Sequence, residues 1–348
     1  MKNSGKKIFT SMTFLLAICL CLSFTTFYGC HRNVVPHKTT GFAMGTVISQ
    51  ALYDDDAEVM SKKISSEIKK MEESYLSWRI EGSDVYRINN NADQFVAVND
   101  LTYNWIKTSL DVSKNCNGIF DITIGNLTSL WNIGTEHPRV PSQDEINNAL
   151  KTIDYQRVEL SDKKVKCATN QQLDLGGIGK GAACDRIEQI LDKAKYGGAV
   201  ISVGGSILLH GQNPNADKWS VGIRNPRSEA ASDYVAILKV DNGCVSTSGD
   251  YERVFKKDGV SYHHILDTRT GYPSDSGFIS VTIVCDSGVL SDILSTACFI
   301  LGYEDSLKLL DKYDAEAVFI DKDLNVYATS GIKDSLKITN DSYKLVKG

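Results

Sequence analysis

The stretch with the clearest chemical character is residues 174–185, which read D-L-G-G-I-G-K-G-A-A-C-D. Four glycines fall within six positions, with Lys180 among them and acidic residues at both ends. Glycine lets a backbone approach a ligand closely, and a helix that starts here would aim free N–H groups at an anion. The stretch therefore predicts a phosphate site, although a glycine-rich turn between strand and helix without a ligand fits the same pattern.

Two known phosphate motifs can be compared with this stretch. A Walker loop needs Ser or Thr after its lysine, whereas Lys180 is followed by Gly181. Gly177, Gly179 and Ala182 do fit the dinucleotide pattern G-x-G-x-x-[GA]. That pattern also requires an acidic residue at the end of the next strand, and residues 199–203 are followed by two glycines instead. A Rossmann site is therefore disfavoured.

A second candidate is a pair of oxygen donors four residues apart, Asp292 and Thr296, in a segment with the pattern of a helix over 291–301. At this spacing both side chains share one face of the helix. A carboxylate and a hydroxyl suit a hard cation such as Mg²⁺, which often bridges to substrate phosphates. The alternative is a surface aspartate and a threonine bonded to its own backbone.

A third candidate region, residues 262–273, contains two histidines, an acid and an arginine. His263 and His264 could transfer protons near neutral pH, but neighbours in a strand face opposite ways, so one of them at most should enter a given site. Arg269 could clamp a phosphate or pair with Asp267. Trp78 could stack on an aromatic ligand or belong to the core.

The first 30 residues have the layout of an export signal. Lysines at the start precede the apolar run 8–27, and Gly29-Cys30 follows. Glycine before cysteine predicts a bacterial lipoprotein signal with Cys30 acylated, although plain cleavage or a retained anchor is also compatible with the run. Residues 31–40 are predicted to be a tether, and residues 41–340 a single catalytic domain.

The net charge and the spacing of the cysteines bear on which partners and metal sites are expected. The formal net charge of -5 is spread out with no basic block, which disfavours nucleic acid as a partner. Six cysteines follow the signal and show no C-x-x-C or zinc spacing, so most are expected to be small core residues.

The apolar periodicity predicts an α+β fold, with runs of antiparallel strands and helices between them. Helices are expected at 59–75, 101–116, after a capping box at Ser142 and Glu145, at 183–194, 291–301 and 305–313. Strands are expected at 47–52, 119–125, 155–160, 163–168, 199–203, 206–211, 219–224, 234–240, 260–266, 279–285, 316–321 and 325–329.

Seven motifs in order resemble the ApbE family of FAD:protein FMN transferases, over about residues 41–321. They are Met44-Gly-Thr46, Phe120-Asp-Ile-Thr123, Asp174 to Gly181, Val203-Gly-Gly205, Thr247-Ser-Gly-Asp-Tyr251, His264 to Gly271 and Asp292 to Thr296. Three positions depart from the family pattern: His263 stands where many relatives have Ser, Thr268 where Pro is usual, and Ser291 where Ala is usual. None of these removes a principal ligand.

The resemblance implies roles for individual residues. It implies a fold of mixed, largely antiparallel sheets with packed helices, a T-fold-like arrangement of two lobes around an FAD cleft. His264 would transfer the proton. The Gly177 carbonyl, Asp292 and Thr296 would hold Mg²⁺. The residues expected to contact FAD are Met44, Trp78, Ile119, Phe120, Asp121, Asp174, Lys180 and Ile265.

The activity implied is Mg²⁺-dependent transfer of the FMN part of FAD to a Thr or Ser hydroxyl of a target protein, with release of AMP. Two alternatives are an FAD pyrophosphatase that uses water in place of the hydroxyl, and a non-catalytic exported flavin-binding lipoprotein. The implied partners are redox proteins that carry an Asp-x-x-[ST]-Gly-Ala-Thr segment. The expected location is the periplasmic face of the bacterial inner membrane, with an anchor at Cys30.

Overall fold

The computed structural model describes residues 33–230 and 232–346, so the predicted signal and the anchor at Cys30 lie outside the described part. Residues from Pro36 onward form one compact unit. Within the described ranges, no helix combines the length and the apolar character that a membrane span requires.

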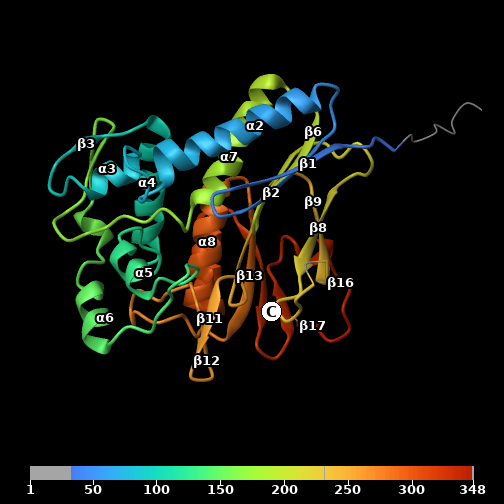
Figure 1. Cartoon of the computed structure of the whole chain (residues 1–348). Coiled ribbons are helices and arrows are strands. Elements are labelled where there is room, and N and C mark those ends of the chain that lie inside the picture. Colours follow the sequence, from blue (N-terminus) through green and yellow to red (C-terminus); the bar gives the residue numbers. More distant parts are fainter. Residues whose placement is uncertain (1–32, 231, 347–348) are drawn as a thin grey trace, which may run out of the picture. The chain divides into compact units, whose positions relative to one another are not determined.

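The unit is built around a nine-stranded sheet in the order β1-β2-β6-β7-β10-β13-β14-β15-β17 (Figure 1). Its neighbouring strands are antiparallel except for the pair β15 and β17. The strands are β1 (His37–Ala43), β2 (Thr46–Leu52), β6 (Gly198–Val203), β7 (Ser206–Gly211), β10 (Gly243–Gly249), β13 (Phe278–Cys285), β14 (Glu316–Asp321), β15 (Asn325–Ala328) and β17 (Lys344–Leu345).

Each face of this sheet is buried by a different layer. Helices α2 (Ala57–Met71), α7 (Gly179–Ala194), α8 (Gly288–Leu301) and α9 (Tyr303–Lys312) belong to one apolar cluster. The small sheet of β8 (Trp219–Arg224), β9 (Tyr234–Val240) and β16 (Leu336–Ile338) belongs to another.

Strand β14 shows how alternation produces the two layers. Ala317 and Phe319 are buried in the cluster that holds the helices, and Val318 and Ile320 in the cluster that holds the small sheet. Successive side chains of a strand point to opposite faces. Because Phe319 is fully buried, its replacement by alanine would cost about 3–5 kcal/mol of folding free energy.

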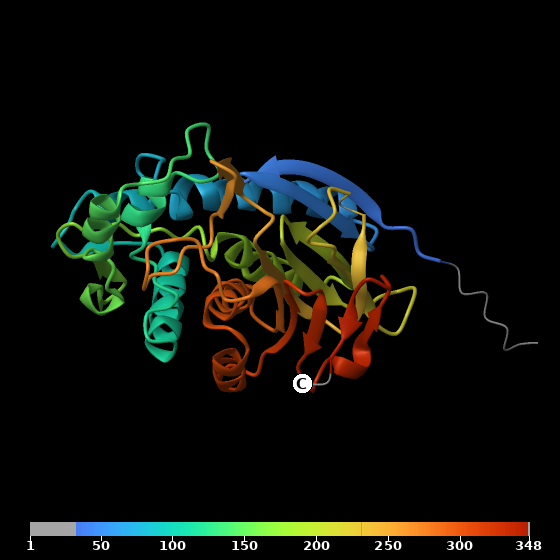
Figure 2. The same cartoon turned by 90° about the horizontal axis from the view of Figure 1, so that it is seen from below.

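A second group of elements lies beside the large sheet, where the short helices gather in both views (Figures 1 and 2). It contains α3 (Asp84–Asn89), α4 (Asp100–Asn115), α5 (Gly125–Trp131), α6 (Gln143–Leu150) and the sheet of β3 (Val96–Ala97), β5 (Lys164–Lys166) and β4 (Glu159–Ser161). The capping box predicted at Ser142 and Glu145 is present at the start of α6. The two-stranded hairpin of β11 (Val254–Lys257) and β12 (Val260–His263) completes the unit.

The predicted α+β class with largely antiparallel sheets is confirmed, and most predicted elements are present within a few residues. The sequence did not predict the short helices α3 and α5 or the short strands β3, β11, β16 and β17. Two further segments differ from their predicted state. Strand β1 begins at His37, inside the segment expected to be a tether, and pairs with β2. The strand expected at 119–125 is absent: residues 119–124 form bends and turns with one isolated bridge between Ile124 and Gln172, and Gly125 begins α5. The Asp121 carboxylate accepts hydrogen bonds there that take the place of a strand ladder.

The six cysteines in the described residues are all free and buried, as predicted for small core side chains. Burial raises the pKa of the Cys298 thiol to about 12 and that of Cys285 to about 12. These thiols therefore stay protonated at neutral pH and are poor nucleophiles.

Candidate functional site

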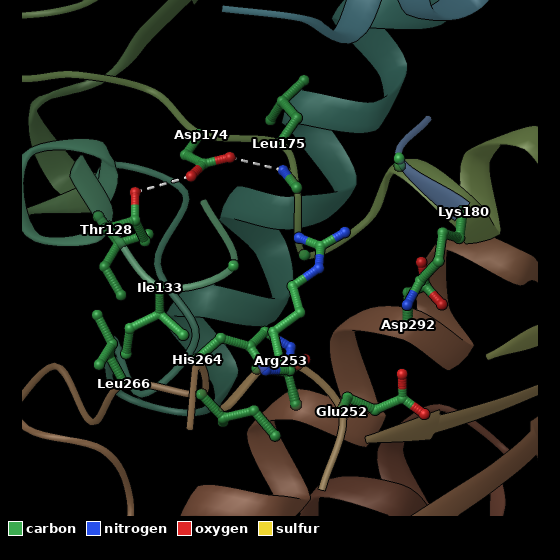
Figure 3. A pocket seen from close by; sticks show the side chains of 18 of the residues that line it. Thr128, Ile133, Asp174, Leu175, Lys180, Glu252, Arg253, His264, Leu266 and Asp292 are labelled. Carbon is green, nitrogen blue, oxygen red and sulfur yellow. Dashed lines mark hydrogen bonds between the residues drawn. The ribbon is translucent and has the colours of Figure 1, made fainter. Parts of the chain in front are cut away.

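A cavity of about 810 Å³ is lined by the β1–β2 turn, the glycine-rich turn with the start of α7, one side of α8, and α5 with its neighbouring loops. This volume is in the range of small-molecule binding sites. Every candidate site residue predicted from the sequence, other than Cys30, lines it: Met44, Trp78, Ile119, Phe120, Asp121, Asp174, Gly177, Lys180, His264, Ile265, Asp292 and Thr296. Segments far apart in the sequence are thus brought to one site (Figure 3).

Helices α7 and α8 cross in direct backbone contact, and this crossing places Asp292. A Cβ added at Gly181 would lie 1.9 Å from the Gly288 carbonyl oxygen, so only glycine permits the approach. The Asp185 carboxylate on α7 accepts hydrogen bonds from Ser287 Oγ at 3.0 Å and from the backbone N–H groups of Gly288 and Val289 at the start of α8. One function of the glycine-rich stretch is therefore close helix packing.

Asp292 is a buried residue, 4% exposed, and neither of its carboxylate's hydrogen-bond donors is a cation. Its Oδ2 accepts from the Gly181 N–H at 2.7 Å, and its Oδ1 accepts from Ser206 Oγ at 2.5 Å. These bonds fix both carboxylate oxygens at the wall of the cavity. An ionised carboxylate buried without a cation is costly, so this position favours one nearby.

The other two expected metal donors lie along the same wall of the cavity. Thr296 is one helical turn after Asp292, with its hydroxyl 3.4 Å from Ser248 Oγ. Gly177 is exposed in the turn before α7, and a Cβ there would meet the Phe120 ring at 3.1 Å. The donor set of carboxylate, hydroxyl and carbonyl oxygens suits a hard cation such as Mg²⁺.

Asp121 acts inside the wall rather than as a free acid. Its Oδ1 accepts from the Thr123 N–H at 2.8 Å and hydroxyl at 2.7 Å, and its Oδ2 accepts from the Tyr155 N–H at 2.8 Å. Burial raises the pKa of this carboxyl, and the hydrogen bonds oppose that effect. Asp121 thereby fixes the turn that presents Ile119 and Phe120 to the cavity.

Asp174 holds the glycine-rich turn in a similar way, as Figure 3 shows. One oxygen accepts from the Gly176 N–H at 2.8 Å and the other from the Thr128 hydroxyl on α5 at 2.8 Å. The carboxylate therefore joins this turn to α5.

The β1–β2 turn and the end of α2 form another part of the wall. Met44 has a positive φ of 53°, and its N–H donates to Glu72 Oε2 at 2.9 Å, which stabilises this uncommon conformation. Glu72 begins a π-helical turn, Glu72–Leu76, that leads to Trp78. The Arg79 guanidinium lies 4.0 Å from the centroid of the Trp78 ring, so that ring is partly covered by a cation.

Of the two adjacent histidines, only His264 lines the cavity. His263 is buried, with Nε2 bonded to the Ser274 carbonyl and its ring edge-on to Phe299. The Nδ1 atom of His264 is buried and has no hydrogen-bond partner among the described residues. Burial, followed by the charges of Arg253 and Lys180, lowers the pKa of His264 to about 3. Its imidazole is therefore neutral at pH 7, with a nitrogen free to accept a proton.

The structure also brings Glu252 and Arg253 to the cavity, neither of which the sequence singled out. Ser248, from the motif Thr247 to Tyr251, lines it too, and Ser206 contacts the lining residue Asp292. Ser206 reaches the site through its bond to Asp292, which no short motif reveals. Arg253 lies two residues after the motif Thr247 to Tyr251, which was the one available signal. Arg269 stays outside the cavity and pairs with Asp267 at 2.6 Å, the second of the two arrangements considered for it.

A separate group of side chains that could bind a metal lies outside the cavity. It consists of Glu188, Asp192 and His210. His210 Nδ1 is 2.8 Å from Glu188 Oε2, and its Nε2 is 2.9 Å from the Tyr196 carbonyl. Burial lowers the pKa of His210, but the hydrogen bond and charge of Glu188 outweigh it and leave the pKa raised. These contacts indicate that the group contains an ion pair between Glu188 on α7 and His210 on β7.

Comparison with known proteins agrees with this geometry. The sequence model of the ApbE family matches residues 44–319. The FAD:protein FMN transferase of Treponema pallidum is 34% identical over 79% of this chain and 81% of its own length. The FAD:protein FMN transferase of Klebsiella pneumoniae is 32% identical over 82% of this chain and 90% of its own length.

A solved structure supports the same assignment. The crystal structure of the ApbE protein of Thermotoga maritima superposes with a TM-score of 0.78 at 32% identity, covering 86% of this chain and 99% of that one. Since both the family match and the relatives span most of the sequence, the chain belongs to the ApbE family.

Proposed function

We infer that this chain is an enzyme, an FAD:protein FMN transferase, which moves the FMN part of FAD onto a hydroxyl of a target protein and releases AMP. The observation that carries this inference is the gathering of all twelve family-type residues around one cavity. The names of the similar proteins from Treponema pallidum and Klebsiella pneumoniae support it.

In this proposal, Mg²⁺ is bound by Asp292, Thr296 and the Gly177 carbonyl. The buried Asp292 carboxylate, which has hydrogen-bond donors but no cationic partner, supports the assignment. Bound there, the ion would supply positive charge to the pyrophosphate and to the departing AMP. Gly181 and Ser206 keep the carboxylate oriented.

The chain's own residues would position the substrates and move one proton. Met44, Trp78, Phe120 and Ile265 would contact the flavin end of FAD, and Lys180 the pyrophosphate. The hydroxyl oxygen of the acceptor protein forms a bond to the FMN-side phosphorus. The bond from that phosphorus to the bridging oxygen breaks, and AMP departs with that oxygen.

The imidazole of His264 would receive the proton of the attacking hydroxyl. The pKa of about 3 is too low for an efficient base in the empty site. Since Arg253 and Lys180 contribute to that low value, the negative charge of a bound pyrophosphate would oppose them and raise the pKa. The base would thus become stronger when FAD is present.

We propose that the mature protein is exported and held at the outer face of the cytoplasmic membrane by a lipid on Cys30. The basic start, the apolar run and the Gly29-Cys30 pair support this. Acceptors would then be exported or membrane-bound redox proteins that carry an Asp-x-x-[ST]-Gly-Ala-Thr segment.

The experiment is a chromatographic assay of FAD, FMN and AMP with the protein from residue 31 onward, Mg²⁺ and an acceptor domain. AMP formed only with acceptor supports transfer, AMP and free FMN without acceptor indicate a pyrophosphatase, and unchanged FAD indicates a flavin carrier. Asp292→Ala should abolish the magnesium-dependent formation of AMP. Asp241→Ala, at an exposed carboxylate outside the cavity, serves as the control. Full magnesium-dependent turnover by Asp292→Ala would refute the metal assignment.

A further inference from the structure

Arg253 carries a positive charge that none of the residues described so far neutralises. Its side chain lines the cavity, and Figure 3 shows it reaching into the space between His264 and the glycine-rich turn. Every other arginine of the described ranges has a hydrogen-bond acceptor, an ion-pair partner or an aromatic ring. Within the same ranges, the Arg253 side chain has none of these.

Two glycines from separate loops make room for this arginine. A Cβ added at Gly134, which has a φ of 83°, would lie 2.8 Å from Arg253 Cδ. A Cβ added at Gly45, in the β1–β2 turn with a φ of 68°, would lie 3.7 Å from Arg253 Nη2. Arg253 is an exposed residue, and its side chain passes close to the backbones of both loops at the cavity.

The backbone of Arg253 is fixed as well. Its carbonyl accepts from the His264 N–H at 3.1 Å, directly beside the first pair of the β11–β12 hairpin, Val254 and His263. Arg253 and His264 are thus neighbours across two chain segments. The guanidinium is held close to the histidine that we place at the reacting hydroxyl.

The cavity lining carries five carboxylates and three cations, so binding of an anion depends on which of the cations are free. The carboxylates of Glu72, Asp121, Asp174 and Asp292 each accept hydrogen bonds from the protein, and Glu252 lies 3.8 Å from Arg224.

Lys180, near Gly205, likewise has no hydrogen-bond or ion-pair partner for its ammonium group in the described part of the chain. The two cations that line the cavity without a partner are therefore Lys180 and Arg253.

We propose that Arg253 forms an anion-binding subsite that holds the pyrophosphate of FAD together with Lys180. This deepens the proposed function and rests on it. A guanidinium presents its N–H donors in a planar fork that matches two phosphate oxygens, which an ammonium group cannot do. The subsite orients the FMN-side phosphorus next to His264 and supplies charge where AMP departs.

The test measures FAD binding rather than turnover, by quenching of flavin fluorescence in EDTA, so that it does not depend on the metal assignment. Arg253→Met should weaken FAD binding about 10- to 100-fold, because a charge-assisted contact to phosphate is lost. Arg253→Lys should fall between wild type and Arg253→Met. Lys256→Met removes a charge from the same hairpin outside the cavity and should bind FAD as the wild type does.

Riboflavin, which has no phosphate, separates this role from a general disturbance of the site. Arg253→Met should bind riboflavin as the wild type does. The subsite is refuted if Arg253→Met binds FAD with the wild-type affinity, including the case where only its KM for the acceptor protein rises. It is also refuted if the affinities for riboflavin and for FAD fall by the same factor. A wild-type chain that binds FAD but gives no transfer would refute the proposed function and leave the subsite standing.

Discussion

Replacing His264 by glutamine should flatten the dependence of stability on pH. The pKa of His264 is lowered to about 3 in the folded protein, first by burial and then by Arg253 and Lys180. In the unfolded chain a histidine titrates near 6.5. The unfolded state therefore takes up a proton as the pH falls below 6.5, while the folded state does not, and the free energy of unfolding decreases.

The size of the effect follows from this pKa difference. Each pH unit below 6.5 costs about 1.4 kcal/mol, so the wild type should lose up to about 2 kcal/mol between pH 7 and pH 5 through this residue. Because His264 as a residue is only partly buried, this is an upper value. His264→Gln should show a loss smaller by that amount.

Urea unfolding at pH 7, 6 and 5 measures this difference. His137→Gln, at an exposed histidine, controls for the loss of an imidazole, and it should follow the wild-type profile. The effects of His210 and His263 are common to all three proteins and cancel in the comparison. Parallel profiles for wild type and His264→Gln would show that the imidazole is not held neutral by its surroundings.

Three further perturbations have defined outcomes. Gly181→Ala should lower the free energy of unfolding by about 3 kcal/mol or more in urea, because its Cβ would meet the Gly288 carbonyl oxygen. Gly41→Ala, with open space around the added Cβ, should change it little. Equal stabilities of the two variants would contradict the helix crossing. Ser206→Ala should weaken Mg²⁺ binding about 10-fold in calorimetry by releasing Asp292, and unchanged affinity would exclude this positioning role. Cys30→Ala should abolish labelling by a fatty-acid analogue in cells, and retained label would exclude lipidation at that residue.

The sequence predicted the elements whose apolar pattern is regular. Strands β6 to β9 and helices α4 and α8 were expected nearly at their observed positions, because alternation or helical periodicity marks a buried face. The strand predicted at 119–125 was wrong, because apolar residues of this segment, Ile119, Phe120 and Ile124, line the cavity. There, hydrogen bonds to Asp121 take the place of strand pairing.

The candidate site was predictable to the extent that short motifs carry it. Asp292 and Thr296 share a helix face, and the glycine-rich stretch does approach another group closely, but that group is Gly288 on α8. No local pattern could reveal that Ser206 reaches Asp292 or that Arg253 crosses between two loops. Those contacts depend on tertiary packing over long sequence separations.

The most direct test of the central claim is the intact mass of an acceptor domain after incubation with the protein, FAD and Mg²⁺, followed by fragmentation to locate the modification. Transfer predicts a gain equal to one phosphoester-linked FMN on a single Thr or Ser of the acceptor, with an equal amount of AMP. His264→Gln and Asp292→Ala should each reduce the gain strongly. An acceptor of unchanged mass, alongside complete conversion of FAD to free FMN and AMP, would contradict the claim.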